Sequence, residues 1–532
     1  METYSWYNIR VGEISGSDPS PSSSSQKDTD GPQVVCFAAF GSLFTGYSLA
    51  VFAFTIGQPT FYSSLGLEQD ATAPGYSYTN DILGAANGVF FGTGFFGCFL
   101  AGWAGNRFGR VNGFRIAAVI GIIGGTLQCG SQSPAMFLVA RAVAGLAAGH
   151  AMAAMPTYFA EVSPPHYRGL ITGAHAIFIN LGYCTAGWIG FGCYFTPDSE
   201  FAWRFPFAMV IIWASCLLSG SFYVPESPRF LVLHDDHQKA LDVLIRLHHD
   251  PCDPNNTFAH QELNMIREKW EAEKDIIKSD GRWRLFSKKS NRQRLVLACL
   301  VMIGGQNIGP LVINNYNVLL YNSLGLGSTT SLLLSAVYNT VGLLIACIGG
   351  LIADRLGRRK CMITGYVLVT CAFATLTGMI AQYNNTPTEG WAAAATTMVY
   401  IYVVCYNSCI DLNQFTIATE IFPTHVRNQA SAVAISGLFL ADILWLNLLP
   451  TATATIGWKY YLVFVCLAVV HTIYLIFYLP ETGGWHLEEM DRAVNGGSGP
   501  SKNEAAEACA KNERDDTRIE TLPNSMHIDK KE

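Results

Sequence analysis

The 532-residue sequence contains few charged residues, and they are unevenly distributed. Charged residues make up 14% of the chain, whereas they make up roughly 25% of ordinary globular domains. No lysine occurs between Lys27 and Lys239, and residues 34–224 contain only six arginines and six acidic residues. Residues 294–479 contain twelve charges in all. Because a water-exposed surface cannot be built from so few charges, this scarcity argues against a soluble enzyme.

Patterns for nucleic-acid, metal or dinucleotide binding are also lacking. The net charge is −6, without the clustered Lys/Arg face that nucleic-acid binding needs. The 15 cysteines lie in apolar stretches without a CxxC pair, which indicates neither a metal site nor a disulfide framework. Glycine-rich stretches at 92–97 and 145–149 lack a following βαβ unit and favour close helix packing instead. We therefore expect no nucleic-acid partner, no metal, no cofactor and no enzymatic activity.

Long apolar runs are abundant, and half of the residues are hydrophobic. A membrane-spanning helix needs about 20 mostly apolar residues, and the chain offers twelve such runs, six on each side of a polar block. The predicted spans lie near residues 34–62, 82–104, 114–131, 134–158, 170–194, 203–224, 294–321, 330–353, 361–382, 391–419, 428–450 and 457–479. The sequence therefore predicts an all-α, multi-pass membrane protein in contact with the lipid bilayer.

The basic residues indicate how these spans are oriented. Every second connection lacks Lys and Arg, whereas the alternate connections contain nearly all of them and are expected in the cytosol with both termini. Asn384 begins a sequon in an outer connection and is a predicted glycosylation site. The sequon at Asn255 lies on the inner side and should stay unmodified. The plasma membrane is the expected location, although a vacuolar membrane fits the same charge rule.

The two sets of spans repeat one another. Three pairs of short motifs occur in the same order, 248 to 259 residues apart. The pairs are residues 102–110 and 350–358, 161–168 and 420–427, and 225–226 and 480–481. Two parallel six-helix halves with a site between them are the architecture of an alternating-access transporter. The expected segments are a polar tail at 1–33, halves at 34–224 and 294–480, a charged linker at 225–293 and a hydrophilic tail at 481–532.

At this level of detail the chain resembles the sugar-porter branch of the major facilitator superfamily, especially its fungal hexose and lactose permease-like members. The resemblance rests on Arg141, Gly145 and Gly149, on Pro156, Tyr158, Glu161, Pro164 and Arg168, on Pro225 to Arg229, on Asp354 to Arg359, and on Pro480 to Thr482. It implies the superfamily's fold, with twelve transmembrane helices as two six-helix pseudo-repeats. It also implies a helical intracellular domain at 225–293, for which a flexible linker is the alternative.

The same resemblance implies a role for charges just inside the membrane. Ion pairs between helix ends in this family latch the outward-open form, and such contacts must break when the halves rock. The predicted latch consists of Arg107, Glu161, Arg168, Asp354, Arg358, Glu420 and Arg427. The alternative is that these charges only set the topology. Asn106 departs from the pattern, because family members usually carry Asp at this position.

Polar side chains inside the apolar spans are the candidates for a solute site. Asn407, Asp411 and Gln414 recur at a spacing that places them on one helical face. Sugar recognition needs many groups that both donate and accept hydrogen bonds, together with flat aromatic walls. The predicted substrate-binding residues are Gln306, Asn314, Asn315, Asn407, Asp411, Gln414, Asp442, His175 and Asn180, with Tyr316, Tyr338 and Trp445 as walls. For each of them a helix–helix hydrogen bond is the alternative role.

Departures from the family pattern are concentrated at the expected solute site. Ser48 stands where proton-coupled members carry Asp, and Ala176 and Leu311 stand where sugar-binding Gln and Asn align. The usual Pro-Trp of the tenth span is Asn413-Gln414, and Asp442 replaces an Asn of the eleventh span. The fold therefore carries over from the resemblance, whereas hexose as the substrate does not.

The sequence predicts a transporter, either secondary active or facilitative, for a small polyhydroxylated solute such as a sugar, a polyol or a sugar-derived acid. Protons are a second expected partner if Asp411 or Asp442 titrates, since burial disfavours a charged carboxylate and hydration restores it. Facilitated diffusion is the alternative. Two other functions stay open at this point: an exporter of a secondary metabolite, and a non-transporting nutrient sensor with a short cytosolic tail.

Overall fold

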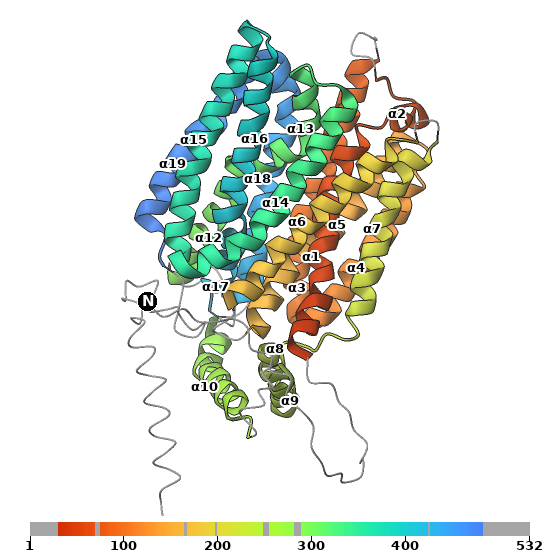
Figure 1. Ribbon diagram of the computed structural model, residues 1–532. Helices are drawn as coiled ribbons and strands as arrows, with labels where there is room; N and C mark the ends of the chain where they lie inside the picture. The colour runs from red at the N-terminus through yellow and green to blue at the C-terminus, as the bar shows by residue number, and fades with distance from the viewer. Residues whose placement is uncertain are drawn as a thin grey trace, which may run out of the picture.

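The computed structural model describes residues 30–69, 75–163, 168–196, 199–247, 255–280, 289–423 and 426–481. These residues form helices and connecting loops without any strand, and twelve of the helical segments are long and apolar enough to cross a membrane. Two bundles of long helices stand next to each other, with three further helices beneath them (Figure 1). The prediction of an all-α protein with twelve spans is confirmed.

The N-terminal bundle follows the predicted spans, with one correction. Its helices are α1 (Asp30–Thr55), α2 (Pro59–Leu65), α3 (Tyr76–Arg107), α4 (Arg110–Cys129), α5 (Pro134–Val162), α6 (Arg168–Cys193) and α7 (Phe201–Gly220). The first span was expected to continue to residue 62. It ends at Thr55, because Gly57 and Pro59 interrupt the helix, and the short α2 follows as a separate element.

The C-terminal bundle contains two broken helices. Its elements are α12 (Lys289–Asn307), α13 (Pro310–Ser323), α14 (Ser328–Leu356), α15 (Arg358–Asn385), α16 (Glu389–Cys409), α17 (Asp411–Glu420), α18 (Arg427–Ile456), the 3-10 turn η3 (Gly457–Lys459) and α19 (Tyr460–Tyr478). The seventh span breaks at Gly309, whose φ of +82° suits glycine, just before Pro310. The tenth span breaks at Ile410, between α16 and α17.

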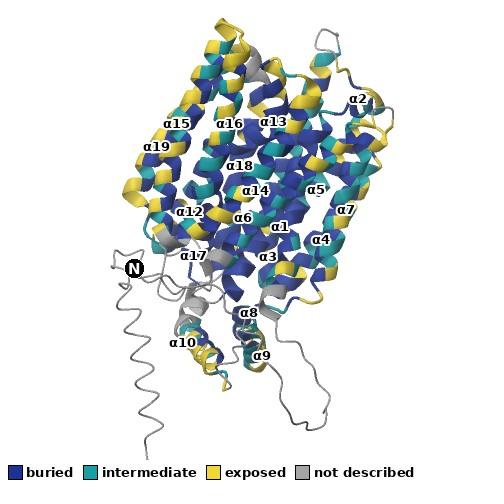
Figure 2. Cartoon of the chain, in the orientation of Figure 1, coloured by how far each residue is buried: buried dark blue, intermediate teal, exposed yellow. Residues whose placement is uncertain are grey.

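The two bundles pack along α3 against α18 and along α6 against α14. Buried residues gather where the bundles meet, whereas exposed residues lie on the outward faces (Figure 2). Phe477 and Val470 on α19 are 76% and 65% exposed, as expected for side chains that contact lipid rather than water. Within the N-terminal bundle, a Cβ atom on Gly145 or Gly149 would collide with the α3 backbone, which confirms the packing role expected of these glycines.

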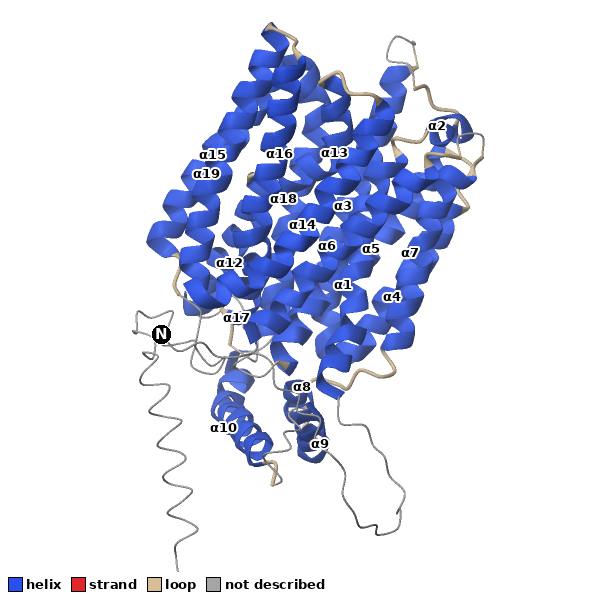
Figure 3. Ribbon diagram, in the orientation of Figure 1, coloured by secondary structure: helices blue, strands red, loops and turns tan. Residues whose placement is uncertain are grey.

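Three further helices follow α7, outside the two bundles. They are α8 (Pro228–Leu233), α9 (His237–Leu247) and α10 (Thr257–Asp280), seen beneath the bundles in Figure 3. A small apolar cluster packs these three helices together, and each helix contributes one buried residue: Val232, Ala240 and Ile266. The predicted tails at 1–33 and 481–532 lie outside the described residues, apart from residues 30–33 and Glu481.

Candidate functional site

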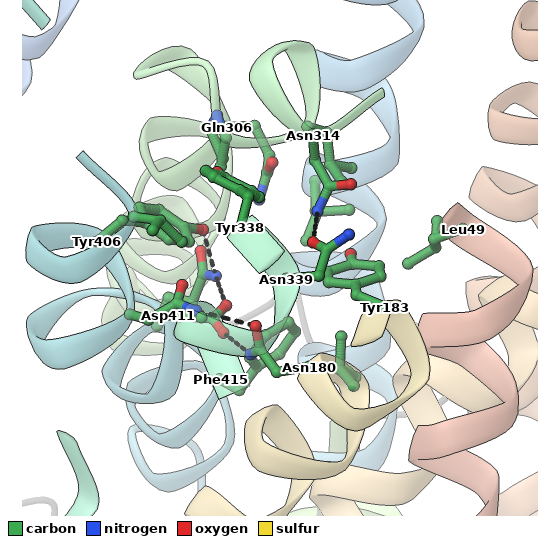
Figure 4. Close-up of a pocket in the computed structure, with 18 of the residues that line it drawn as sticks. Leu49, Asn180, Tyr183, Gln306, Asn314, Tyr338, Asn339, Tyr406, Asp411 and Phe415 are labelled. Atoms are coloured by element: carbon green, nitrogen blue, oxygen red, sulfur yellow. Dashed lines mark hydrogen bonds between the residues drawn. The ribbon is translucent and has the colours of Figure 1, made fainter. Parts of the chain in front are cut away.

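A cavity lies between the two bundles, near the middle of the helices that line it (Figure 4). The empty space within it is about 540 Å³ when the part open to solvent is included. Six of the nine predicted substrate-binding residues line it: Asn180, Gln306, Asn314, Asn407, Asp411 and Gln414. Both bundles contribute to its wall, so relative movement of the bundles would open or close the cavity.

A hydrogen-bond network crosses the cavity from one bundle to the other. The Asn180 side chain on α6 donates from Nδ2 to Oδ2 of Asp411 at 2.8 Å, and its Oδ1 accepts from Asn407 at 2.9 Å. On the far side, Gln414 Nε2 donates to Oδ1 of Asp411 at 3.3 Å and to the Tyr406 hydroxyl at 3.1 Å. Asn180 is therefore a polar bridge to the C-terminal bundle.

The break at Ile410 explains how Asp411 is positioned. Asp411 is the first residue of α17, so its carboxylate lies in the positive field at a helix N-terminus. The neighbouring Asn413 donates from Nδ2 to the carbonyl oxygen of Cys409 at 2.7 Å, which satisfies one carbonyl that the break leaves free. An uninterrupted helix would not provide this positive end at mid-membrane depth.

Several amide atoms at the cavity have no hydrogen-bond partner within the described part of the chain. Asn314 Nδ2 donates to Asn339 Oδ1 at 3.2 Å, which leaves Asn314 Oδ1 and Asn339 Nδ2 unpartnered. Gln306 Oε1 and Gln414 Oε1 are unpartnered as well. Because a buried polar atom without a partner is costly, these atoms are the natural contacts for a solute.

Aromatic side chains complete the wall. Tyr338 lines the cavity as predicted, and Tyr183, Tyr406 and Phe415 also line it although they were not foreseen. Position could have indicated two of them, since Tyr183 lies almost one turn beyond Asn180 and Tyr406 directly precedes Asn407. The other two expected walls lie elsewhere: the Tyr316 hydroxyl donates to the carbonyl oxygen of Leu446, and the Trp445 indole donates to Asn307.

Three predicted substrate-binding residues are not among those that line the cavity. His175 is hydrogen-bonded to Ser42 at 2.8 Å, with its ring edge-on to Phe415, so it joins α1, α6 and α17. Asn315 donates to the carbonyl oxygen of Leu311 on its own helix, because it points away from the face that carries Asn314. Asp442 is buried on α18, one turn beyond the cavity residue Leu438.

A second set of polar residues lies at the end of the N-terminal bundle that is nearest to α8 and α9. Arg110 forms a two-pronged ion pair with Glu161, with Nε–Oε2 and Nη2–Oε1 distances of 2.9 and 2.8 Å. The Glu226 carboxylate accepts from the backbone N–H groups of Arg110 and Val111 at the start of α4. Burial raises the pKa of Glu226, although these hydrogen bonds oppose the rise.

The C-terminal bundle repeats this arrangement at equivalent residues. Arg358 pairs with Glu420 at 3.1 Å, and Glu481 accepts from the backbone N–H groups of Arg358 and Arg359 at the start of α15. Each ion pair therefore joins helix ends within a single bundle. The latch prediction also named Arg107, which is exposed at the end of α3, where the turn at Gly109 leaves Arg110 to reach Glu161.

At this same end, the contact between the bundles is formed by other groups. Asn428 on α18 donates from Nδ2 to the carbonyl oxygen of Gly102 and to Oδ1 of Asn106, both at 3.0 Å. Arg427 donates to the carbonyl oxygen of Phe422 and acts electrostatically on Glu161 of the other bundle. The side chains of Arg168 and Asp354, two further predicted latch residues, lie outside the described part of the structure.

Comparison with known proteins places this architecture in a family. The family described as "Sugar (and other) transporter" matches residues 34–494. An MFS-type transporter, criB, from Aspergillus cristatus is 30% identical to the chain, over 85% of this chain and 90% of the relative. The chain belongs to the sugar transporter family. The quinate permease of Emericella nidulans is a further relative, 26% identical over 85% of this chain and 86% of the permease.

The fold of this sugar transporter family member matches a solved relative. The proton:xylose symporter XylE bound to 6-bromo-6-deoxy-D-glucose superimposes with a TM-score of 0.76 at 23% identity, over 87% of this chain and 98% of the symporter. At this identity the similarity establishes the fold alone. Together with the twelve spans, it establishes an integral, multi-pass membrane protein whose family and fold are those of transporters.

The positions that depart from the family pattern occupy distinct places in this transporter family member. Ser48 is buried on α1, and its hydroxyl oxygen has no partner among the described residues. The backbone carbonyl of Ala176 accepts a hydrogen bond from Asn180 at 2.9 Å. Leu311 and Gln414 both line the cavity. Two of the changed positions thus alter the wall directly.

Proposed function

We propose that the protein carries a small polyhydroxylated solute, such as a sugar, a polyol or a sugar-derived acid, across the membrane by alternating access. The main support is the cavity between the bundles, which combines amide side chains with flat tyrosine rings. Polyhydroxylated solutes need groups that donate and accept hydrogen bonds, and apolar ring faces that cover the sugar. The family match and the quinate permease favour this function over the exporter and the sensor.

The contacts of Asn180 support the alternating-access mechanism. Its side chain bonds to Asp411 and Asn407 on the other bundle, so any separation of α6 from α16 and α17 on that side breaks both bonds. A solute that replaces them would lower the cost of the separation. Such differential contact is what allows a ligand to shift a conformational equilibrium.

Asp411 is the proposed point of contact with protons. Its hydrogen bonds come from the neutral amides of Asn180 and Gln414, so an entering proton would not displace an ion pair. Opening of the cavity to water would favour the charged carboxylate, and closing of the cavity would favour the neutral carboxyl group. Coupled transport through Asp411 and plain facilitation are the two forms of the proposal.

Uptake of a labelled sugar and polyol panel tests the proposal in cells that lack their own carriers, at acidic and at neutral external pH. Saturable uptake that falls at neutral pH and is lost in Asp411→Asn would support proton coupling. Uptake that depends neither on the external pH nor on the Asp411→Asn substitution would support facilitated diffusion. Asp81→Asn is the matched control, because this exposed acid lies near the start of α3, outside the cavity. No uptake from a correctly localised protein would overturn the proposal.

We further propose that the two cytoplasmic clusters stabilise the closed cytoplasmic end, together with Arg107, Arg168, Asp354 and Arg427. Each cluster ties the start of one helix to the segment that leaves the last helix of its bundle, through Glu226 or Glu481. The hydrogen bond from Asn428 to Gly102 then joins the two bundles, whose helix ends are fixed by these clusters. Cysteine labelling at the cytoplasmic ends of α3 and α18 would report opening in variants that lack either ion pair.

The orientation and location belong to the same proposal: both termini in the cytosol, the protein in the plasma membrane, and Asn384 glycosylated. Asn384 is exposed near the end of α15, on the side opposite α8, α9 and α10. Asn384→Gln should remove a glycosidase-sensitive mass shift, whereas Asn255→Gln should leave it unchanged. The reverse result would invert the proposed orientation.

A further inference from the structure

The cavity contains a carboxylate but no basic side chain among the described residues that line it. Asp411 is only 8% exposed, and its hydrogen-bond donors are the uncharged amides of Asn180 and Gln414. A buried carboxylate without a countercharge loses hydration that neutral partners replace only in part. A solute that brings its own positive charge would supply what this wall lacks.

A second carboxylate strengthens the negative character of the region. Asp442 is 2% exposed on α18, and its Oδ2 atom has no partner among the described residues. The Tyr183 phenol, which lines the cavity, lies within electrostatic reach of both Asp411 and Asp442. The other titratable groups at the cavity wall are the phenols of Tyr338 and Tyr406, and neither of these can act as a cation.

Amide oxygens without a partner lie at the wall. They belong to Gln306, Asn314 and Gln414, and each lacks a hydrogen-bond donor among the described residues. An ammonium group offers three donors and no acceptor, whereas a carboxylate offers only acceptors. These oxygens therefore complement an ammonium group, whereas the carboxylate of Asp411 repels a carboxylate on the solute. Hydrogen bonds between an ammonium group and such acceptors are also stronger than those between neutral groups.

The aromatic wall is compatible with the same chemistry. Tyr338 and Tyr406 both line the cavity beside Asp411 (Figure 4). A cation held against the face of an aromatic ring gains electrostatic stabilisation, most of all where water is excluded. The same rings can cover the apolar face of a sugar, so one wall serves both parts of a solute that carries hydroxyl groups and an amine.

We propose that the preferred solute is a polyhydroxylated amine in its protonated form, such as an amino sugar or an amino polyol, and that sugar acids are poor solutes. The ammonium group binds at Asp411, with Asp442 adding to the negative field, and the hydroxyl groups bind the amides of the C-terminal bundle. This inference rests on the proposed function, since it requires that the cavity binds the transported solute.

Competitive uptake into cells or proteoliposomes that contain the full-length chain tests the inference. The probes are glucose, glucosamine and glucuronate, which share one ring and differ in charge, at a pH where the amine is protonated. We expect the KM for the amine to be about tenfold lower than for the neutral sugar, as a charge-assisted hydrogen bond allows. The acid should compete weakly or not at all.

The variants separate charge from shape. Asp411→Asn should abolish the preference for the amine, so that glucose and glucosamine compete equally, and Asp442→Asn should reduce the preference by a smaller factor. Asp81→Asn, which removes an exposed charge outside the cavity, should leave the preference unchanged. If Asp411→Asn is not produced as a folded protein, Asp442→Asn and the wild-type comparison of the three probes still decide the matter.

The possible results distinguish this inference from the proposed function. Equal uptake of glucose and glucosamine, or strong uptake of glucuronate, would overturn the amine preference and leave a polyol transporter in place. A preference for the amine that survives Asp411→Asn and Asp442→Asn would overturn the assigned site. Failure of all three probes and of the wider sugar panel would overturn both proposals.

Discussion

The two bundles are alike at the ends that carry the buried Arg–Glu pairs and unlike at the cavity. At the ends, Arg110 with Glu161 and Arg358 with Glu420 occupy equivalent positions in the repeat and form the same ion pair. At the cavity, the N-terminal bundle contributes Asn180 and Tyr183 beside apolar side chains. The C-terminal bundle contributes the remaining polar side chains, which are Gln306, Asn314, Tyr338, Asn339, Tyr406, Asn407, Asp411 and Gln414.

This contrast separates two tasks. In the proposed mechanism both bundles hold their helix ends while they rock, and the repeat supplies the same charged triad to each, Arg110–Glu161–Glu226 and Arg358–Glu420–Glu481. The same proposal needs only one bundle to carry most of the solute contacts, because the opposite bundle can close over the solute as a largely apolar wall. The predictions below test whether the ends are truly equivalent and whether the cavity is truly one-sided.

The largest effect is expected from breaking either buried ion pair. Glu161→Gln and Glu420→Gln each leave an arginine without its countercharge, which costs about 3–5 kcal/mol when the pair is buried. The loss should be somewhat larger for Glu161, whose side chain is 0% exposed beside an Arg110 side chain that is 6% exposed, than for the C-terminal pair at 2% and 10%. Thermal unfolding of the purified variants measures this loss of stability.

The control is the pair formed by Glu200 and Arg204, in which the glutamate side chain is 60% exposed. Glu200→Gln should cost less than about 1 kcal/mol, as expected for a surface pair. If one of the two buried variants behaved like this control, the equivalence of the two ends would fail.

The next largest effect is expected at the bridge between the bundles. Asn180→Ala removes hydrogen bonds to Asp411 and Asn407 at once and leaves both without a partner from α6. We expect kcat/KM for the transported solute to fall about 10- to 100-fold. Asn314→Ala, which loses only the bond to Asn339, should cost about tenfold or less. If Asn180→Ala and Asn314→Ala lost equal fractions of the initial uptake rate, the bridge between the bundles would contribute no more than a hydrogen bond within one bundle.

A smaller effect is expected where α14 approaches the network. A Cβ atom at Gly342 would lie 2.8 Å from Asn407 Nδ2 and 3.4 Å from Asn180 Oδ1, so Gly342→Ala must displace the Asn407 amide. The KM should rise a few-fold while the amount of folded protein stays the same. Gly378→Ala on α15 is the matched control, since nothing lies within 4 Å of its Cβ position. An unchanged KM would place the solute away from this wall.

The smallest effect is expected in the pH dependence of thermal stability, through Glu226 at the start of α4. Burial raises the pKa of Glu226, so its charged form is less favourable in the folded protein than in the unfolded chain. The carboxyl group therefore contributes stability below its ordinary pKa, and this contribution is lost as the pH rises through the raised value. Glu226→Gln should flatten this part of the curve of thermal stability against pH.

Glu481→Gln provides the comparison for the equivalent carboxylate of the C-terminal bundle, which contacts the same backbone positions. If the Glu226→Gln curve followed the wild-type curve throughout, the pH dependence would have to come from another group.

Much of the architecture could be predicted because the membrane imposes simple rules. Apolar runs of sufficient length indicated the spans, and repeated motifs indicated two equivalent halves. The spacing of Asn407, Asp411 and Gln414 indicated a common helical face, and all three line the cavity. Pro310 indicated the break of the seventh span, since proline cannot donate the backbone hydrogen bond that continues a helix.

The choice of partners could not be predicted in the same way. Arg107 and Arg110 lie three residues apart, and the sequence contains no measure of which one reaches Glu161; the turn at Gly109 decides it. His175 lies five residues before Asn180, about 140° around the helix, and there it contacts Ser42 of α1 and Phe415 of α17. Helical periodicity defines a face, but neighbouring helices decide what that face contacts.

By itself the sequence determined the membrane-spanning architecture, the repeat and most of the polar residues available for a solute, because hydrophobicity, charge placement and spacing are local properties of the chain. The tertiary structure alone decided that Asp411 begins a helix at mid-membrane depth, that Asn180 joins it from the other bundle, and that the charged triads close within each bundle. These are contacts between distant segments, and they depend on how the helices are packed and rotated.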